Sequence, residues 1–227
     1  MRAEKAKKAE TERTEILDPR SLHFGPEPSE GDGVSSDELA VRDELELKAA
    51  VPDPDELRSR LLAAGALVRF RGRMSDRRYD RAGELALRDE LLRVRSYHHA
   101  NDRVTVVLGW KGAARRSSEG YKRRAEVELP VADRVATVHA LLTALGYDVV
   151  HAVDRDVEVF ELDGALVRTE RYPLMDTLVE VEGEPEAMER AIQASGIPRG
   201  AFSAESLAEF VRRFEQRTGT VARLALS

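Results

Sequence analysis

The 227-residue chain contains no cysteine and no long apolar segment. The absence of cysteine excludes a disulfide framework, a thiolate zinc site and a cysteine nucleophile. No stretch approaches the roughly 20 apolar residues of a membrane-spanning helix, and residues 1–35 contain no apolar run of signal-peptide length. We therefore expect a soluble cytoplasmic protein without a membrane partner.

Charge of both signs is in excess. Charged residues make up 34% of the chain, with 36 basic and 42 acidic side chains, whereas a typical globular domain has about 25%. The formal net charge of -6 gives the whole molecule no bias toward nucleic acid. The Arg-rich stretch 69–78 could suggest a nucleic-acid module, but carboxylates are interleaved on the neighbouring segments. We therefore expect no nucleic-acid partner.

Composition divides the chain into a tail and one domain. Residues 1–41 are rich in Lys, Glu, Ser, Gly and Pro, which predicts a disordered N-terminal tail. Residues 42–227 have the patterns of a folded domain, with C-terminal helices within 185–217. Start and stop signals predict four helices: one capped by Asp53 and ending at Gly65, one from Val135 to Gly146, one from Pro185 to Gly196, and one capped by Ser203 and running past Phe214. The predicted buried stripe of the second helix is Val135, Val138, Leu141, Leu142 and Leu145.

The other segments alternate apolar and polar residues, which predicts strands. These lie near 43–50, 67–80, 91–97, 103–111, 122–129, 149–161, 164–172 and 177–183. Short connections such as Leu162-Asp163-Gly164 favour antiparallel hairpins. The pattern predicts an α+β fold, with an antiparallel sheet or barrel and accessory helices.

Five of these strands combine an apolar face with a face of almost only Glu, Arg and Lys. An amphipathic sheet with a solvated charged face is the ordinary explanation, but such a face usually also carries Thr, Ser, Gln and Asn. Repeated Glu-x-Glu pairs repel each other unless a cation lies between them. In a barrel with the charged face inside, this pattern calls for Mg²⁺ or Mn²⁺ on the carboxylates and for phosphate oxygens on Arg and Lys. A triphosphate carrying metal ions matches both.

Five motifs of these residues follow one another along the chain. They are Glu-x-Glu-x-Lys at Glu44, Glu46 and Lys48, Arg-x-Arg at Arg93 and Arg95, Lys-Gly at Lys111 and Gly112, Arg-x-Glu-x-Glu at Arg124, Glu126 and Glu128, and Glu-x-Glu at Glu180 and Glu182. In this order and spacing, residues 43–183 resemble the CYTH family, the triphosphate tunnel metalloenzymes. That family includes class IV adenylyl cyclases, thiamine triphosphatases and inorganic triphosphatases. The resemblance implies a closed eight-stranded antiparallel tunnel flanked by helices.

The resemblance also implies roles for individual residues. The expected metal ligands are Glu44, Glu46, Glu180 and Glu182, supported by Glu128 and Glu170. The expected phosphate-binding residues are Lys48, Arg93, Arg95, Lys111, Arg124 and Arg168. Glu44, Glu46 and Lys48 are the expected catalytic residues. The expected cofactor is Mg²⁺ or Mn²⁺, and the expected substrate is ATP, inorganic triphosphate or thiamine triphosphate.

The sequence departs from the family pattern in three places. The family's Lys-x-Arg pair is represented only by Arg155, and the Asp of the penultimate strand by Glu170. The Asp-x-Tyr-Phe-Asp element is matched in part by Asp76, Tyr79 and Asp80, and we interpret Asp76 and Asp80 as structural.

Three functions stay open at this point. They are a phosphohydrolase releasing phosphate, a class IV adenylyl cyclase making cyclic AMP and pyrophosphate from ATP, and a sensor that binds polyphosphate or a nucleotide without turnover. We interpret Trp110 and Tyr121 as core or rim packing, and His98 and His99 as part of an exposed turn. The basic loop around Ser117 and Ser118 is a possible lid. The sequence leaves a homodimer open.

Overall fold

The computed structural model describes residues 42–131 and 134–226, so the predicted tail of residues 1–41 lies outside the described residues. The strands are β1 (Arg42–Ala50), β2 (Leu67–Asp80), β3 (Leu91–His99), β4 (Val104–Lys111), β5 (Arg115–Arg116), β6 (Lys122–Pro130), β7 (Asp148–Leu162), β8 (Ala165–Arg171) and β9 (Leu178–Glu182). The helices are α2 (Pro54–Ala63), α3 (Glu84–Leu87), α4 (Val135–Ala144), α5 (Pro185–Ser195) and α6 (Leu207–Thr218), with a short 3₁₀ turn at Arg199–Ala201. None of the helices in these ranges is long and apolar enough to cross a membrane.

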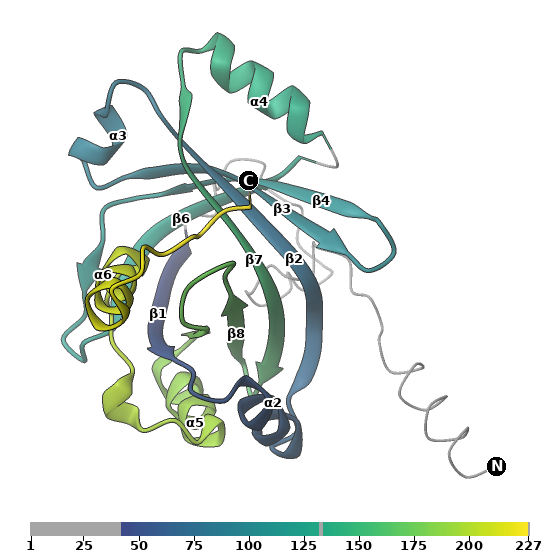
Figure 1. The fold of residues 1–227 in the computed structure, drawn as a ribbon, viewed down its shortest axis with the longest axis vertical. Helices are drawn as coiled ribbons and strands as arrows, with labels where there is room; N and C mark the ends of the chain where they lie inside the picture. The colour runs from purple at the N-terminus through teal and green to yellow at the C-terminus, as the bar shows by residue number, and fades with distance from the viewer. Residues whose placement is uncertain (1–41, 132–133, 227) are drawn as a thin grey trace, which may run out of the picture.

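The sheet closes on itself (Figure 1). Its strands follow the order β1-β9-β8-β7-β2-β3-β4-β6-β5, and a further pairing between β1 and β6 joins the two sides. Every pairing is antiparallel. Eight strands therefore form a closed barrel, and β5 is an extra strand paired to β6. The predicted α+β class and eight-stranded antiparallel tunnel are confirmed.

The outer face of the barrel carries the apolar residues of the alternating pattern. Helices α2 and α5 cover one side, where Leu57 and Met188 pack with Val167 and Val181 of β8 and β9. Helix α4 covers the other side, where Val138 and Leu142 pack with Val94 of β3 and Val106 of β4. Because alternate strand residues point to opposite faces, this packing turns the Glu, Arg and Lys positions toward the interior.

Two apolar sections border the charged interior. Phe70 and Met74 of β2 pack with Val157 and Val159 of β7 in one section. In the other, Phe210 of α6 packs with Val153, Tyr172 and Leu178. The charged side chains therefore occupy a defined stretch of the barrel.

Local sequence signals placed most helix ends correctly. Asp53 caps α2 by accepting hydrogen bonds from the amides of Asp55 and Glu56, each at 3.0 Å. Gly196 ends α5 with φ of 73°, a left-handed conformation that favours glycine. The hairpin at Asp163-Gly164 also forms, with φ of 49° and 84°.

Other expectations about the helices are wrong. Ser206, not Ser203, caps α6, because Ser206 forms a reciprocal capping box with Glu209. Ser203 instead exchanges backbone hydrogen bonds with Lys48 at the end of β1. The stripe of α4 is narrower than predicted, since Leu141 and Leu145 are exposed. Helix α3 and strand β5 were not predicted.

Candidate functional site

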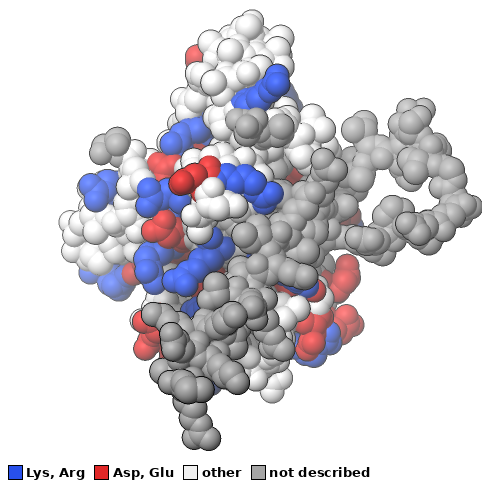
Figure 2. Space-filling model, turned by 90° about the vertical axis from the view of Figure 1, so that its right-hand side faces the viewer, with Lys and Arg blue, Asp and Glu red and all other residues white. Residues whose placement is uncertain are grey.

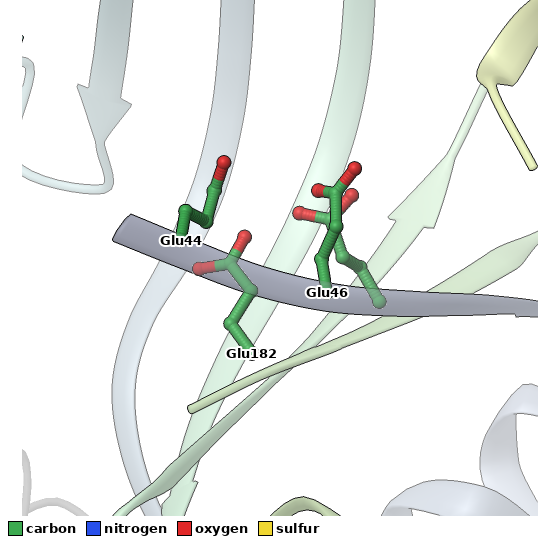
Figure 3. A group of neighbouring side chains, drawn as sticks. Glu44, Glu46 and Glu182 are labelled. Carbon is green, nitrogen blue, oxygen red and sulfur yellow. The ribbon is translucent and has the colours of Figure 1, made fainter. Parts of the chain in front are cut away.

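Four carboxylates meet inside the barrel (Figure 3). Glu44 and Glu46 lie on β1, and Glu180 and Glu182 lie on its antiparallel neighbour β9. Glu46 is directly opposite Glu182 in the register. One oxygen of each of the four carboxylates lies within 4.8 Å of those of the other three. Like charges opposite one another in a sheet repel, so this arrangement suits an intervening cation.

Basic side chains surround this group of four carboxylates. Lys48 contacts Glu46 at 2.8 Å and also pairs with Glu180. Lys111 pairs with Glu44, and Lys122 pairs with Glu46. Arg168 pairs with Glu180 and contacts Glu182 at 2.7 Å. These ion pairs fix the positions of the four carboxylates, but the number of basic partners differs from one carboxylate to another.

Glu182 differs in acidity from Glu44 and Glu46. Burial, opposed by Arg168 and reinforced by the charge of Glu44, raises its pKa to about 7. The pKa of Glu46 is well below its usual range, because Lys48, Lys122 and Lys111 outweigh its burial. Lys111 likewise outweighs burial and lowers the pKa of Glu44. A carboxyl group that keeps its proton at neutral pH indicates that the basic side chains nearby do not balance all the negative charge. Carboxylate oxygens are also the ligands that Mg²⁺ and Mn²⁺ prefer. The residues present therefore fit a divalent ion.

This acidity predicts that metal binding depends on pH. A bound cation must displace the proton of Glu182, so the apparent Kd for Mn²⁺ should rise about tenfold for each pH unit below about 7. The folded-state pKa of Glu182 lies above the unfolded value of about 4.3. The protonated Glu182 therefore contributes its full stability to the metal-free protein below the unfolded pKa. This contribution is lost as pH rises from the unfolded pKa through the folded pKa of about 7. The rise in Tm caused by a fixed Mn²⁺ concentration should thus be larger at pH 8 than at pH 6. An equal rise at both values would contradict this expectation.

A second charged group lies on β2, β3, β7 and β8. The Asp76 carboxylate accepts two hydrogen bonds from Arg95, at 2.7 and 2.9 Å, and one from Arg155 at 3.0 Å. Arg155 also donates to Glu170 at 2.9 Å, and Arg168 does so at 3.2 Å. We call Asp76, Arg95, Arg155 and Glu170 the arginine network. Arg155 and Arg168 hold the pKa of Glu170 at about 2 despite burial, so Glu170 stays ionised at neutral pH.

Arg93 of β3 pairs with two carboxylates of β6. Its Nη2 donates to Glu126 and Glu128, both at 2.9 Å, and Glu126 in turn contacts Lys111 at 3.2 Å. Arg93 is 8% exposed. Its Nε is the one buried side-chain nitrogen or oxygen without a hydrogen-bond partner in the described part of the chain. A buried donor without a partner is costly, which makes this atom a position for an oxyanion.

The structure brings together most of the site residues predicted from the sequence. The four expected metal ligands form one group, which Lys48, Lys111 and Arg168 contact. Arg95 lies in the arginine network, and Arg93 pairs with Glu126 and Glu128. Glu128 and Glu170 are outside the group of four and bind arginines instead. Arg124 is held at the barrel rim, where it donates to the carbonyl of Gly112 at 2.6 Å and to Asp89.

Two interior residues were given no role, and two others were interpreted as structural. Asp76 does lie in a structural network of ion pairs, and this network is part of the charged interior. Asp76 itself is only 4% exposed. Lys122 and Glu126 were not assigned roles, although they share the inner face of β6 with Arg124. Asp80 caps the start of α3 by accepting hydrogen bonds from the amides of Leu85 and Ala86, as its structural interpretation predicts.

The remaining candidates lie outside the charged interior. Tyr121 is buried in the outer core and donates to Glu189 at 2.7 Å, and Trp110 is half-buried. His98 is exposed and His99 is partly buried beside the turn that joins β3 to β4. The loop around Ser117 forms a hairpin between β5 and β6. On the face of the molecule drawn in Figure 2, Lys and Arg side chains lie beside Asp and Glu side chains among the described residues.

Comparison with solved structures identifies the fold. The PH1819 protein of Pyrococcus horikoshii OT3 matches with a TM-score of 0.62 and 23% identity, over 75% of this chain and 98% of that one. A candidate adenylate cyclase of Vibrio parahaemolyticus matches with a TM-score of 0.61 and 15% identity, over 76% and 99% of the two chains. The chain has their fold. HpAC1 of Hippeastrum, an adenylyl cyclase candidate described as having a dominant triphosphatase activity, matches with a TM-score of 0.54 and 19% identity, over 79% and 96%. No protein-family model and no curated protein sequence matches the chain.

Proposed function

We propose that this chain is a CYTH-type enzyme that hydrolyses a triphosphate with a divalent metal ion and releases phosphate. The observation that carries the proposal is the group of four carboxylates in a closed barrel whose interior also holds arginines, one of them with a buried Nε that has no partner among the described residues. The fold is shared with proteins named as cyclase candidates and with one described as a triphosphatase. The order of the sequence motifs adds support from outside the structure.

The charges of the interior suit a ligand of mixed charge. Acidic and basic residues balance in number. The acidic residues are Glu44, Glu46, Asp76, Glu126, Glu128, Glu170, Glu180 and Glu182, and the basic residues are Lys48, Arg78, Arg93, Arg95, Lys111, Lys122, Arg155 and Arg168. A metal ion alone or a polyphosphate alone would upset this balance in a region screened from water. The two together would preserve it. We therefore expect metal and triphosphate each to strengthen the binding of the other.

The proposed division of labour follows from these positions. Glu44, Glu46, Glu180 and Glu182 hold the metal ion, which supplies positive charge to the phosphoryl oxygens when bound. Lys48 and Lys111 lie against those carboxylates and can turn their ammonium groups to phosphate oxygens. Arg93 and Arg95 hold the phosphate chain from neighbouring inward positions of β3. Fixed cations of this kind stabilise the charge that spreads over a transferred phosphoryl group.

A class IV adenylyl cyclase is the second candidate. A cavity of about 350 Å³ is lined by Trp110, Arg115, Arg123 and Arg124. An indole and guanidinium groups can stack on a base. In that case the ribose 3′-hydroxyl would attack the α-phosphorus of ATP and pyrophosphate would leave.

Product analysis tests the proposal. The protein is incubated with tripolyphosphate, thiamine triphosphate or ATP, each with Mg²⁺ or Mn²⁺, and the products are separated. Orthophosphate is the expected product, and its formation should stop when the metal is chelated. Cyclic AMP with pyrophosphate from ATP would favour the cyclase. Tight metal-dependent binding without any product at stoichiometric protein would favour the sensor and contradict both enzymes.

A further inference from the structure

Arg78 lies on the strand that faces the carboxylates across the barrel. Going round the closed sheet, β2 is the fourth strand from β1 in both directions, by way of β9, β8 and β7 or by way of β6, β4 and β3. Arg78 shares the inner face of β2 with Asp76 and Met74, which are both buried. The side chain is therefore placed opposite the strand that carries Glu44 and Glu46.

The immediate neighbours of Arg78 are other basic groups. In the register of the sheet it is directly opposite Arg93 on β3 and His151 on β7. No hydrogen bond or ion pair is found for the Arg78 side chain within residues 42–131 and 134–226. Arg95 and Arg155 of the arginine network, by contrast, are each paired with Asp76. Arg93 is a like charge directly opposite Arg78, and such pairs destabilise a sheet. Within the described ranges Arg78 thus has no carboxylate partner of the kind that a structural arginine has.

Two further observations point to an anion at this place. Arg93, opposite Arg78, is the buried side chain whose Nε has no partner among the described residues. On its other side Arg93 is opposite Gly109, which has no side chain to cover it. In addition, burial lowers the pKa of Arg78, and the charges of Arg93, Arg155 and Arg95 add to this effect, whereas Asp76 opposes it. An anion bound beside Arg78 would offset this repulsion.

We infer that Arg78 and Arg93 form an anion subsite that holds a phosphoryl group of the substrate on the wall opposite the four carboxylates. The identity of the ligand rests on the proposed function, whereas the subsite itself rests on the position of Arg78 opposite Arg93 and on the Arg93 Nε, which has no partner among the described residues. Contacts link the subsite to the carboxylates in a continuous series, from Arg93 through Glu126 and Lys111 to Glu44. Arg78 is thus a binding and specificity residue for linked phosphates, whose oxygens match the fork of a guanidinium group.

The test measures three properties of Arg78→Gln. Isothermal titration calorimetry gives the affinity for tripolyphosphate in the presence of Mn²⁺ and the affinity for Mn²⁺ alone, and thermal unfolding gives the Tm of the ligand-free protein. Loss of one charge-assisted contact should weaken tripolyphosphate binding about 10- to 100-fold. Binding of Mn²⁺ alone should stay unchanged. The ligand-free Tm should be equal or higher, because a repulsion between cations is removed.

Arg77→Gln is the matched control, because Arg77 is the next residue on β2 and points outward to Asp154. It should bind tripolyphosphate as the wild type does.

Wild-type affinity in Arg78→Gln would overturn the inference. A parallel fall in tripolyphosphate affinity, Mn²⁺ affinity and ligand-free Tm would also overturn it, since that pattern indicates a structural role. If the wild type binds Mn²⁺ and tripolyphosphate but Arg78→Gln is unaffected, the proposed function survives without the subsite. If the wild type binds neither, both are wrong.

Discussion

Glu182→Gln should abolish metal-dependent turnover while the protein stays folded. Glu182 is one of the four grouped carboxylates, and its replacement removes a ligand charge from the proposed metal position. Losing several kcal/mol of electrostatic stabilisation of the transition state corresponds to a fall of at least about a thousandfold in kcat. The measurement is orthophosphate release from the best triphosphate substrate at saturating Mg²⁺ or Mn²⁺.

The fold should tolerate this change better than a change of the other three grouped carboxylates. Because the pKa of Glu182 is about 7, a neutral group already occupies this position in part of the metal-free molecules at neutral pH. Glu46, in contrast, balances both Lys48 and Lys122, so its loss would leave buried cations. Circular dichroism and the ligand-free Tm of Glu182→Gln should therefore resemble those of the wild type.

Glu158→Gln is the matched control for Glu182→Gln. Glu158 pairs with Arg58 of α2 on the outer side of β7, at 3.1 Å, so its replacement leaves the charges of the barrel interior unchanged. It should keep wild-type turnover. Near-normal turnover in Glu182→Gln would refute the metal assignment of the four carboxylates.

Period-two alternation predicted the strands and their inner faces because it is a local property of each segment. The strands that form β1 and β9 were identified with their charged positions, and the meeting of Glu44, Glu46, Glu180 and Glu182 follows once the two strands are neighbours. That adjacency is not local. It was expected only from the resemblance of the motifs to those of a known family.

The missed features depend on which segments become neighbours. Asp76 and Arg155 are far apart in the sequence, and only the pairing of β2 with β7 brings them together. Arg78 lies in an Arg-rich stretch, and its place opposite Arg93 is visible only in the register. The error at Ser203 has a similar cause, because β1 pairs with β6 only as far as Glu46, which leaves the backbone of Lys48 available to Ser203.

Asp76→Asn should cause the largest loss of stability of any single change in the arginine network. Asp76 balances the charges of two buried arginines, Arg95 and Arg155. Removing one partner of a buried ion pair costs roughly 3–5 kcal/mol. In a domain of this size that loss lowers the Tm by roughly 6 to 20 °C. Thermal and urea unfolding of the ligand-free protein measure both quantities.

The pH dependence of this effect follows from the sign of the pKa shift. Arg95 and Arg155 outweigh burial and hold the pKa of Asp76 well below its usual range. The stability that Asp76 contributes is therefore complete above its unfolded pKa of about 3.9 and is lost as pH falls toward the lower folded value. The difference between the wild type and Asp76→Asn should be constant from pH 6 to pH 8 and should shrink in strongly acidic solution.

Asp156→Asn provides the comparison, because Asp156 pairs with Arg73 at 3.2 Å and both side chains are about half exposed on the outer face. An exposed pair of this kind contributes about 1 kcal/mol or less, so its Tm should change by only a few degrees. Equal losses in the two variants would mean that burial does not set the strength of the Asp76 pairs. A large loss confined to Asp76→Asn would show instead that the charged interior is held in place by its own ion pairs before any metal or phosphate is bound.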